Sequence, residues 1–306
     1  MNAGTPPVSI VVLGSATGDL IVRQRRLAEV GETIFGTDFT TVPGGKGLNQ
    51  AVAAARAGGD VRFLGAVGDD EYGRAARSVL NEAGADTSGL AVVDAPTGTA
   101  HISVLDGGDN SIVIVPAANA AVSSLDDDAK ATIDAAGFIV AQFERPLPLI
   151  GEAFTRARER GIQTVLTPAP VTPGGTDLLD LVDILVPNER EAQELSGEED
   201  PYQAARSLSA RAGLVILTRG ERGGIVARGG EIISEFRAHV VDAIDTTGAG
   251  DTFVGVLVAW LSHGAPLPRA IDAAAVAAAV SVTRRGASSS VPERREILHF
   301  LDSARG

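Results

Sequence analysis

The sequence predicts an α/β fold in which a doubly wound, mostly parallel sheet carries helices on both faces and a small β-sheet serves as a lid. Residues 8–13 form a β-branched apolar run that ends at Gly14, which is typical of a strand buried on both faces. From Ala136 onward, strand-like and helix-forming segments alternate along the chain. Between these regions, short strand-like segments in about residues 20–43 and 97–116 predict the separate lid.

The composition narrows the class of protein before any motif is considered. The chain has 306 residues, no cysteine and a formal net charge of -13. The lack of cysteine excludes a disulfide framework, a cysteine-ligated zinc and a cysteine nucleophile. The negative charge argues against nucleic acid and anionic membranes as partners, because both attract basic surfaces. With no signal-like N-terminus and no apolar run near about 18 residues, we expect a cytoplasmic protein. The length fits either one large α/β domain or two smaller ones, and we expect a single domain over residues 1–306.

The segment Gly14–Asp19 follows the first predicted strand, at the edge where open α/β sheets bind ligands. Asp19 is a candidate for binding hydroxyl groups, because a carboxylate accepts two hydrogen bonds from a diol. The alternative is that Asp19 only shapes a turn. In the lid we expect short strands and a hairpin, at Glu32–Phe35, Asp38–Val42, Thr99–Leu105 and Ser111–Val115.

A glycine-rich segment, Gly44–Asn49, precedes a strongly helix-forming run. It is not a P-loop, which needs a longer glycine spacing and a Lys-Ser or Lys-Thr pair. Its glycines let a ligand approach the backbone closely, and Lys46 and Asn49 offer hydrogen-bond donors. The alternative is a glycine turn before a solvated helix. The acidic residues 69–71 suit the first turn of the next helix, which reaches about Ala83, and need no metal to explain them.

In the second half, polar residues follow several predicted strands. We expect strands at residues 137–142, 164–166, 182–187 and 214–218, with helices at 146–160 and from residue 188. Glu144, Asn188 and Thr218 come at or just after the ends of these strands. We therefore expect them to lie with Asp19 and Asp251 along one edge of one sheet. Further helices are predicted at residues 270–283 and after Pro292.

The segment Asp245–Asp251 joins a glycine-rich loop to the apolar run Thr252–Trp260. A helix that begins here points backbone N–H groups and the positive end of its dipole at an incoming anion. A carboxylate repels an anion, so Asp251 is better explained as a base beside a phosphoryl group in transfer. The alternative is that Asp251 only caps the helix, since aspartate is a preferred N-cap residue.

Several motifs occur together, in order, over nearly the whole chain. They are Gly14-Ser15, Gly44–Ala51, Pro187–Glu191, Thr218–Gly220, Asp245–Phe253 and Thr283–Ala287. In this set the chain resembles the PfkB-type carbohydrate kinases and, within them, the ribokinase group. The resemblance implies a ribokinase-like fold and ATP-dependent phosphorylation of the primary hydroxyl of a small sugar, with D-ribose favoured and ribose 5-phosphate as product. It also implies a homodimer formed through the lid.

The resemblance further implies a role for individual residues. Asp251 takes the proton of the sugar hydroxyl, while the backbone N–H groups of Gly248, Ala249 and Gly250 stabilise the transferring phosphoryl group. The positions that match sugar-binding residues are Thr17, Asp19, Gly45, Lys46, Asn49, Glu144 and Asp251. Those that match nucleotide-binding residues are Asn188, Thr218, Arg219, Gly220, Gly223, Gly250 and Ala275. Asn188 and Glu191 match positions that serve Mg²⁺ through water and phosphates. An activating potassium site is implied at Asp245, Thr247, Ser281, Arg284, Gly286 and Ser290.

Two positions depart from the ribokinase pattern: Thr17 and Thr167 each stand where asparagine is usual. Loss of the amide at Thr17 removes a two-sided hydrogen-bonding group from the sugar pocket, which leaves open a kinase for another sugar or a nucleoside. A non-catalytic sugar or nucleotide sensor is a remote alternative, because a sensor has no need of Asp251. A dinucleotide-dependent oxidoreductase is set aside, since no Gly-x-Gly-x-x-Gly motif follows the first strand.

Overall fold

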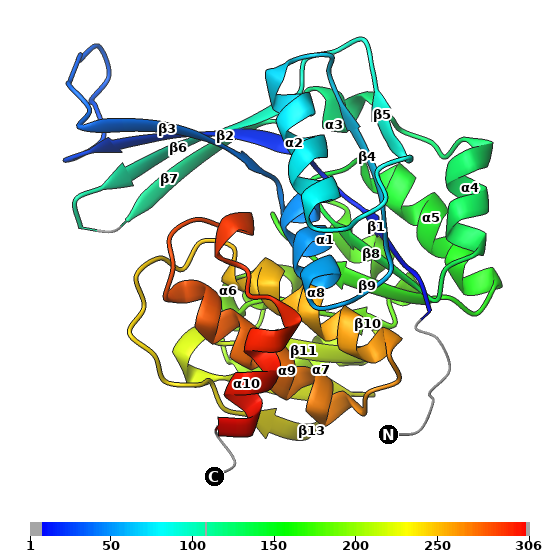
Figure 1. The fold of residues 1–306 in the computed structure, drawn as a ribbon. Helices are drawn as coiled ribbons and strands as arrows, with labels where there is room; N and C mark the ends of the chain where they lie inside the picture. Colours follow the sequence, from blue (N-terminus) through cyan, green and yellow to red (C-terminus); the bar gives the residue numbers. More distant parts are fainter. Residues whose placement is uncertain (1–7, 108, 304–306) are drawn as a thin grey trace.

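The computed structural model describes residues 8–107 and 109–303, and its central feature is a nine-stranded sheet (Figure 1). The strands lie in the order β13-β12-β11-β10-β9-β8-β1-β4-β5. From β11 to β5 every pairing is parallel, and β12 and β13 add an antiparallel edge. Their bounds are β1 Ile10–Leu13, β4 Val61–Val67, β5 Leu90–Val92, β8 Phe138–Gln142, β9 Gln163–Thr167, β10 Ile184–Leu185, β11 Leu214–Thr218, β12 Gly224–Arg228 and β13 Glu231–Phe236. The predicted doubly wound, mostly parallel sheet is confirmed.

Helices cover both faces of this sheet, because its strands bury alternate side chains in two separate apolar cores. In β1, Ile10 and Val12 join one core, and Val11 and Leu13 join the other. The first core is covered by α1 Lys46–Arg56, α2 Glu71–Glu82, α8 Ala249–Ser262, α9 Leu267–Val282 and α10 Arg294–Ser303. The second is covered by α4 Asp127–Asp134, α5 Leu147–Glu159, α6 Glu189–Ser196 and α7 Pro201–Ser209. Short helical segments lie at α3 Ala118–Ala121, η1 Gly175–Leu181, η2 Gly220–Arg222 and η3 Ser288–Ser290.

A second, four-stranded sheet projects from the body of the molecule (Figure 1). Its order is β3-β2-β6-β7, with bounds β2 Thr17–Gln24, β3 Asp38–Gly44, β6 Gly98–Leu105 and β7 Asn110–Val115. β2 pairs antiparallel with β3 and parallel with β6, and β6 pairs antiparallel with β7. The hairpin expected from the sequence is confirmed, although Gly108 in its turn lies outside the described residues. We call these four strands the small sheet.

Two predictions about the small sheet and the polar edge are wrong. Glu32–Phe35 is not a strand, because the partner of Asp38–Gly44 is the longer strand β2, and residues 25–37 form the connection between the two. Asp19 does not lie in a loop beyond β1 but within β2, where the chain pairs on both sides. The polar residues therefore do not share one edge of one sheet. Asp19 comes from the small sheet and Asp251 from α8, which follows a segment, residues 237–248, without a strand.

Glycines allow two close approaches that shape the centre of the molecule. A Cβ on Gly14 would overlap the backbone of Gly47, so the end of β1 lies directly against the start of α1. A Cβ on Gly255 would overlap the carbonyl oxygen of Gln50, so α8 packs against α1 backbone to backbone. Gly255 stands one helical turn after Asp251, so the same close packing brings Asp251 to α1.

No helix in the described ranges is long and apolar enough to span a membrane. The prediction of one domain over residues 1–306 includes positions 1–7, 108 and 304–306, which lie outside the described residues, and it stays a prediction.

Candidate active site

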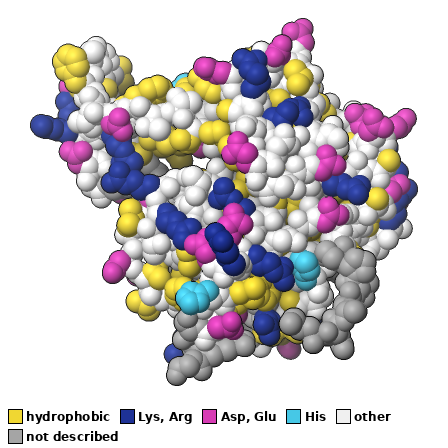
Figure 2. All heavy atoms as spheres, viewed as in Figure 1, with side chains coloured by type: hydrophobic (Ala, Val, Ile, Leu, Met, Phe, Trp, Pro, Cys, Tyr) yellow, Lys and Arg dark blue, Asp and Glu magenta, His cyan; other side chains and the backbone are white. Residues whose placement is uncertain are grey.

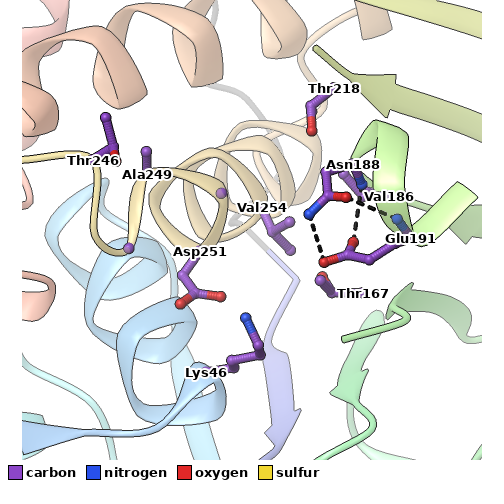
Figure 3. A pocket seen from close by; sticks show the side chains of 12 residues that line it. Lys46, Thr167, Val186, Asn188, Glu191, Thr218, Thr246, Ala249, Asp251 and Val254 are labelled. Carbon is purple, nitrogen blue, oxygen red and sulfur yellow. Dashed lines mark hydrogen bonds between the residues drawn. The ribbon is translucent and has the colours of Figure 1, made fainter. Parts of the chain in front are cut away.

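A pocket of about 160 Å³ lies between the start of α8 and the ends of the central strands (Figure 3). It is lined by Lys46, Thr167, Val186, Asn188, Glu191, Thr218, Thr246, Gly248, Ala249, Gly250, Asp251 and Val254. In Figure 3 the side chains of Asp251 and Lys46 point toward each other, with Asn188 and Glu191 across the pocket from them. The structure thus brings the residues of the predicted catalytic motif to the same cavity as several residues predicted to bind the nucleotide and the metal.

The first turn of α8 forms one wall of this pocket. Gly248 is the N-cap residue and has a φ of 74°, a left-handed conformation that favours glycine. Asp251 is the third residue of the helix and not its cap, and no side chain caps the helix start. The interpretation of Asp251 as a simple N-cap is therefore wrong, because the backbone turns into the helix at Gly248. The N–H groups of this turn lack acceptors within the helix and face the pocket region with the positive end of the dipole.

The Asp251 carboxylate is 7% exposed and is held by two side-chain amides of α1. Gln50 Nε2 donates to Oδ1 at 2.9 Å, and Asn49 Nδ2 donates to Oδ2 at 3.2 Å. Lys46, Asn49 and Gln50 share one face of α1 because they stand at positions i, i+3 and i+4. The negative charge of Asp251 is the main cause that raises the pKa of Lys46 above its ordinary value, so the lysine beside it is a cation.

The predicted sugar residues gather beside Lys46, around Asp19 and Glu144. Burial raises the pKa of Asp19 to about 6, against the effect of the Thr17 hydroxyl, which donates to Asp19 Oδ1 at 2.7 Å. Burial also raises the pKa of Glu144, whose carboxylate accepts from the Ser15 hydroxyl and from the Lys46 backbone N–H, the latter at 3.0 Å. Glycines leave room for these carboxylates. A Cβ on Gly44 would overlap the Asp19 carboxylate, and Gly45 has a φ of 96°.

On the opposite wall, Asn188 and Glu191 form a capping box at the start of α6. Glu191 Oε2 accepts from the Asn188 backbone N–H at 2.9 Å, and Oε1 accepts from Asn188 Nδ2 at 2.7 Å. Burial raises the pKa of Glu191. No cluster of three or more acidic or histidine side chains able to hold a metal occurs within the described ranges. The role of Asn188 and Glu191 toward a divalent ion stays a prediction.

The remaining predicted nucleotide residues lie outside the pocket lining. Gly223 has a φ of 77°, and a Cβ there would overlap the carbonyl oxygen of Phe236, so the turn after β11 requires glycine. Gly220 begins η2 in the same turn. The Arg219 side chain is directed toward Tyr202, whose ring centroid is 5.5 Å from its guanidinium carbon, and toward Glu235 at 3.2 Å. Ala275 is buried on α9. A nucleotide role for these residues stays a prediction.

Three of the predicted potassium residues, Asp245, Thr247 and Gly286, meet where the loop before α8 contacts the loop after α9. Asp245 Oδ1 accepts from the Thr247 backbone N–H at 3.0 Å, and Oδ2 accepts from the Gly286 backbone N–H at 2.9 Å. Burial would raise the pKa of Asp245, but these hydrogen bonds hold it below its usual value. Ser281 and Ser290 are buried. Arg284 stands between them in the sequence, and its guanidinium pairs with Glu296. A potassium site at these residues stays a prediction.

Sequence reasoning missed several residues of the site. Gln50 was visible within the glycine-rich motif, and its place one helical turn from Lys46 is the signal that could have found it. Ser15, which donates to Glu144 and accepts from the Gly47 N–H at 3.2 Å, gave no comparable signal. Thr246 and Val254 line the pocket because they flank the start of α8.

The site thus combines a helix start at the pocket, a buried carboxylate in its first turn and further carboxylates nearby. A phosphotransferase that acts on an alcohol uses parts of these kinds. A family model described as pfkB family carbohydrate kinase matches residues 8–294. The chain belongs to this family of carbohydrate kinases. It is accordingly a sugar kinase, with ATP and a sugar as substrates, and kinases use ATP as its complex with a divalent metal.

Individual relatives match nearly end to end. The chain is 38% identical to a ribokinase of Haemophilus influenzae, over 97% of this chain and 99% of the relative. It is 37% identical to a ribokinase of Bacillus subtilis, over 96% and 99%. Among solved structures, a ribokinase of Thermotoga maritima has a TM-score of 0.88 at 33% identity, covering 96% of this chain and 99% of that chain. A ribokinase of Arabidopsis thaliana in complex with ribose and ATP has a TM-score of 0.88 at 30% identity, with the same coverage.

Proposed function

We propose that the chain transfers the γ-phosphoryl group of ATP to the primary hydroxyl of D-ribose, giving D-ribose 5-phosphate and ADP. The observation that carries this proposal is the position of Asp251. It stands in the first turn of α8, where an anion is favoured, and its charge also acts on Asp19 and Lys46 on the sugar side. Relatives named ribokinase over their full length, one of them in complex with ribose and ATP, support ribose as the sugar.

In the proposed reaction, Asp251 accepts the proton of the sugar hydroxyl as the hydroxyl oxygen attacks the γ-phosphorus. A new phosphorus–oxygen bond forms, the bond to the β-phosphate oxygen breaks, and ADP leaves with that electron pair. The N–H groups of Gly248, Ala249 and Gly250 stabilise the charge on the transferring group. Asp19 and Glu144 hold sugar hydroxyls on the other side, because ionised carboxylates accept hydrogen bonds from them.

We assign the metal roles to two different parts of the site. Mg²⁺, when bound with ATP, neutralises phosphate charge, and Asn188 and Glu191 orient water around it from the start of α6. K⁺, when bound, would be held by Asp245 and by Thr247, Ser281, Arg284, Gly286 and Ser290, mainly through backbone oxygens. It would add positive charge near the α8 turn without entering the chemistry. A cytoplasmic location fits this dependence on ATP.

A kinase for another sugar or a nucleoside is the second candidate function, and one contact favours it. The Thr17 hydroxyl donates its proton to Asp19, at 2.7 Å, so it can only accept from the sugar, whereas an asparagine amide would offer both a donor and an acceptor. A pocket with fewer fixed polar partners discriminates less strongly between hydroxyl patterns.

We propose that the small sheet is also the dimer interface. Apolar side chains stand exposed along β7 and β3, with Ile112 51%, Val113 62% and Phe39 61% exposed. Figure 2 shows hydrophobic side chains gathered over this projecting part of the molecule. Exposed apolar patches of this kind mark protein interfaces. The single domain with this sheet as its lid would then pair with a second copy of the chain.

The proposal is tested by measuring ADP release with MgATP against a panel of pentoses, hexoses and nucleosides, with and without potassium. We expect D-ribose to give the highest kcat/KM and potassium to raise it. A clear preference for another sugar or a nucleoside would establish the second candidate instead, and lack of turnover with any acceptor would contradict both.

A further inference from the structure

Two buried glutamines behind the pocket are not explained by substrate binding or by stability. Gln50 on α1 and Gln142 at the end of β8 are both 0% exposed, and neither lines the pocket. Within residues 8–107 and 109–303, Gln142 Oε1 finds no hydrogen-bond partner. A buried acceptor without a partner costs about 1–3 kcal/mol, and an apolar side chain would avoid that cost. A role beyond packing therefore accounts better for these two amides.

Their hydrogen bonds form a chain that ends on the proposed base. Gln142 Nε2 donates to Gln50 Oε1 at 2.6 Å, and Gln50 Nε2 donates to Asp251 Oδ1 at 2.9 Å. Gln50 Nε2 also donates to Thr167 Oγ1 at 3.2 Å. Gln142 and Thr167 are paired neighbours on β8 and β9, so both of these sheet contacts to Gln50 come from the same position in the sheet.

This arrangement permits only one orientation of the Gln50 amide. If the amide turned over, its oxygen would face the Asp251 carboxylate and its NH₂ group would face the NH₂ group of Gln142. Both contacts are repulsive, so the Gln142 donor and the Asp251 carboxylate together set the direction in which Gln50 donates. The Gln50 donor in turn fixes one oxygen of Asp251, while Asn49 holds the other.

We propose that Gln142 and Gln50 form an amide pair that orients the Asp251 carboxylate toward the sugar hydroxyl, with Gln50 as a positioning residue for phosphoryl transfer and Gln142 acting only through it. The inference rests on the proposed function, since it assigns Asp251 as the base. A base that can rotate loses the alignment that proton transfer requires, even when sugar and ATP still bind. The amide pair should therefore affect kcat and leave KM unchanged.

A double-mutant cycle tests whether Gln142 acts on Asp251 only through Gln50. Gln50→Met, Gln142→Met and the double variant are compared with the unmodified chain, using MgATP and the sugar that the unmodified chain phosphorylates fastest. We expect Gln50→Met to lower kcat about tenfold or more, as loss of a hydrogen bond to a charged group implies, with the KM for sugar unchanged. Gln142→Met should lower kcat by about threefold, and the double variant should equal Gln50→Met, because Gln142 has no other route to the base.

The controls separate this inference from folding and from the proposed function. Gln142→Met removes one acceptor that lacks a partner but leaves Gln50 Oε1 without its donor, so we expect little net change in its melting temperature. Gln163→Met, at an exposed position on β9, is the matched control and should leave kcat unchanged. Unchanged kcat in Gln50→Met, or effects that multiply in the double variant, would overturn the amide pair while leaving the kinase assignment intact. A failure of the proposed function is seen separately, in the activity of the unmodified chain toward D-ribose.

Discussion

Asp251 and Asp19 influence each other across the candidate site, but the structure supports them in opposite ways. Asp251 stands on a buried helix that packs backbone to backbone against α1, and two amides hold its two oxygens. Asp19 stands on the projecting small sheet, where one hydroxyl donates to it and burial raises its pKa to about 6. The proposed chemistry is thus built on rigid, close-packed helices. The proposed sugar contact of Asp19 rests on a projecting sheet, where a single side-chain hydrogen bond, from Thr17, reaches the carboxylate among the described residues.

The largest expected effect is on the helix side. Asp251→Asn removes the proposed base but keeps the size of the side chain, so kcat should fall about 1,000-fold while the sugar still binds. Steady-state kinetics with D-ribose measures this. Asp180→Asn, which alters an exposed ion pair with Arg211, is the matched control and should behave like the unmodified chain. Near-normal turnover in Asp251→Asn would remove the assignment of the base.

On the small sheet, the substitution Asp19→Asn should change mainly the KM for sugar. Replacing the charged acceptor by an amide weakens hydrogen bonds from sugar hydroxyls, so we expect the KM for sugar to rise about 30-fold with kcat changed much less. Asp38→Asn, at an exposed position on β3 of the same sheet, controls for general effects on the small sheet. A fall in kcat with KM unchanged would mean that Asp19 takes part in phosphoryl transfer and not in sugar binding. That result would contradict the division of roles between Asp251 and Asp19.

The pH dependence of KM sharpens the same comparison. Because the pKa of Asp19 is raised to about 6, its carboxyl group takes up a proton as the pH falls through that value and then accepts fewer hydrogen bonds. The KM for sugar should be flat above pH 7 and about tenfold higher at pH 5. In Asp19→Asn this part of the profile should disappear. A rise in KM that persists in the variant would assign the titration to another group.

The smallest effect is expected at Thr17. Thr17→Asn restores a side chain with both a donor and an acceptor, so kcat/KM for D-ribose should rise about threefold relative to other pentoses. Competition between ribose and a second pentose in one reaction measures the ratio directly. Thr41→Asn, at an exposed position on β3, is the control. An unchanged ratio would mean that Thr17 does not select the sugar.

The sequence predicts the two sides of the site unequally, for physical reasons. Strands such as Ile10–Leu13 and Leu214–Thr218 are recognisable because burial on both faces requires continuous apolar residues. The position of Asp19 was mispredicted because glycines around Thr17 suggest a loop, whereas pairing with β3 and β6 makes the segment a strand. Pairing partners distant in sequence leave no local pattern.

The same limit applies to the support of the proposed base. The glycine-rich turn before Asp251 is a local feature and could be interpreted from residues alone. The bond from Gln50 to Asp251 spans 201 positions, and the bond from Gln142 to Gln50 spans 92. Motifs therefore indicate candidate residues, while only the folded chain shows which side chains hold them in place.

Titration of D-ribose into Asp251→Asn and Asp19→Asn by isothermal calorimetry is the most direct test of this division between the two sides. The account predicts that Asp251→Asn binds ribose with nearly the Kd of the unmodified chain, and that Asp19→Asn binds it at least about tenfold more weakly. Equal loss of binding in the two variants would contradict the division, because it would mean that both carboxylates serve to hold the sugar.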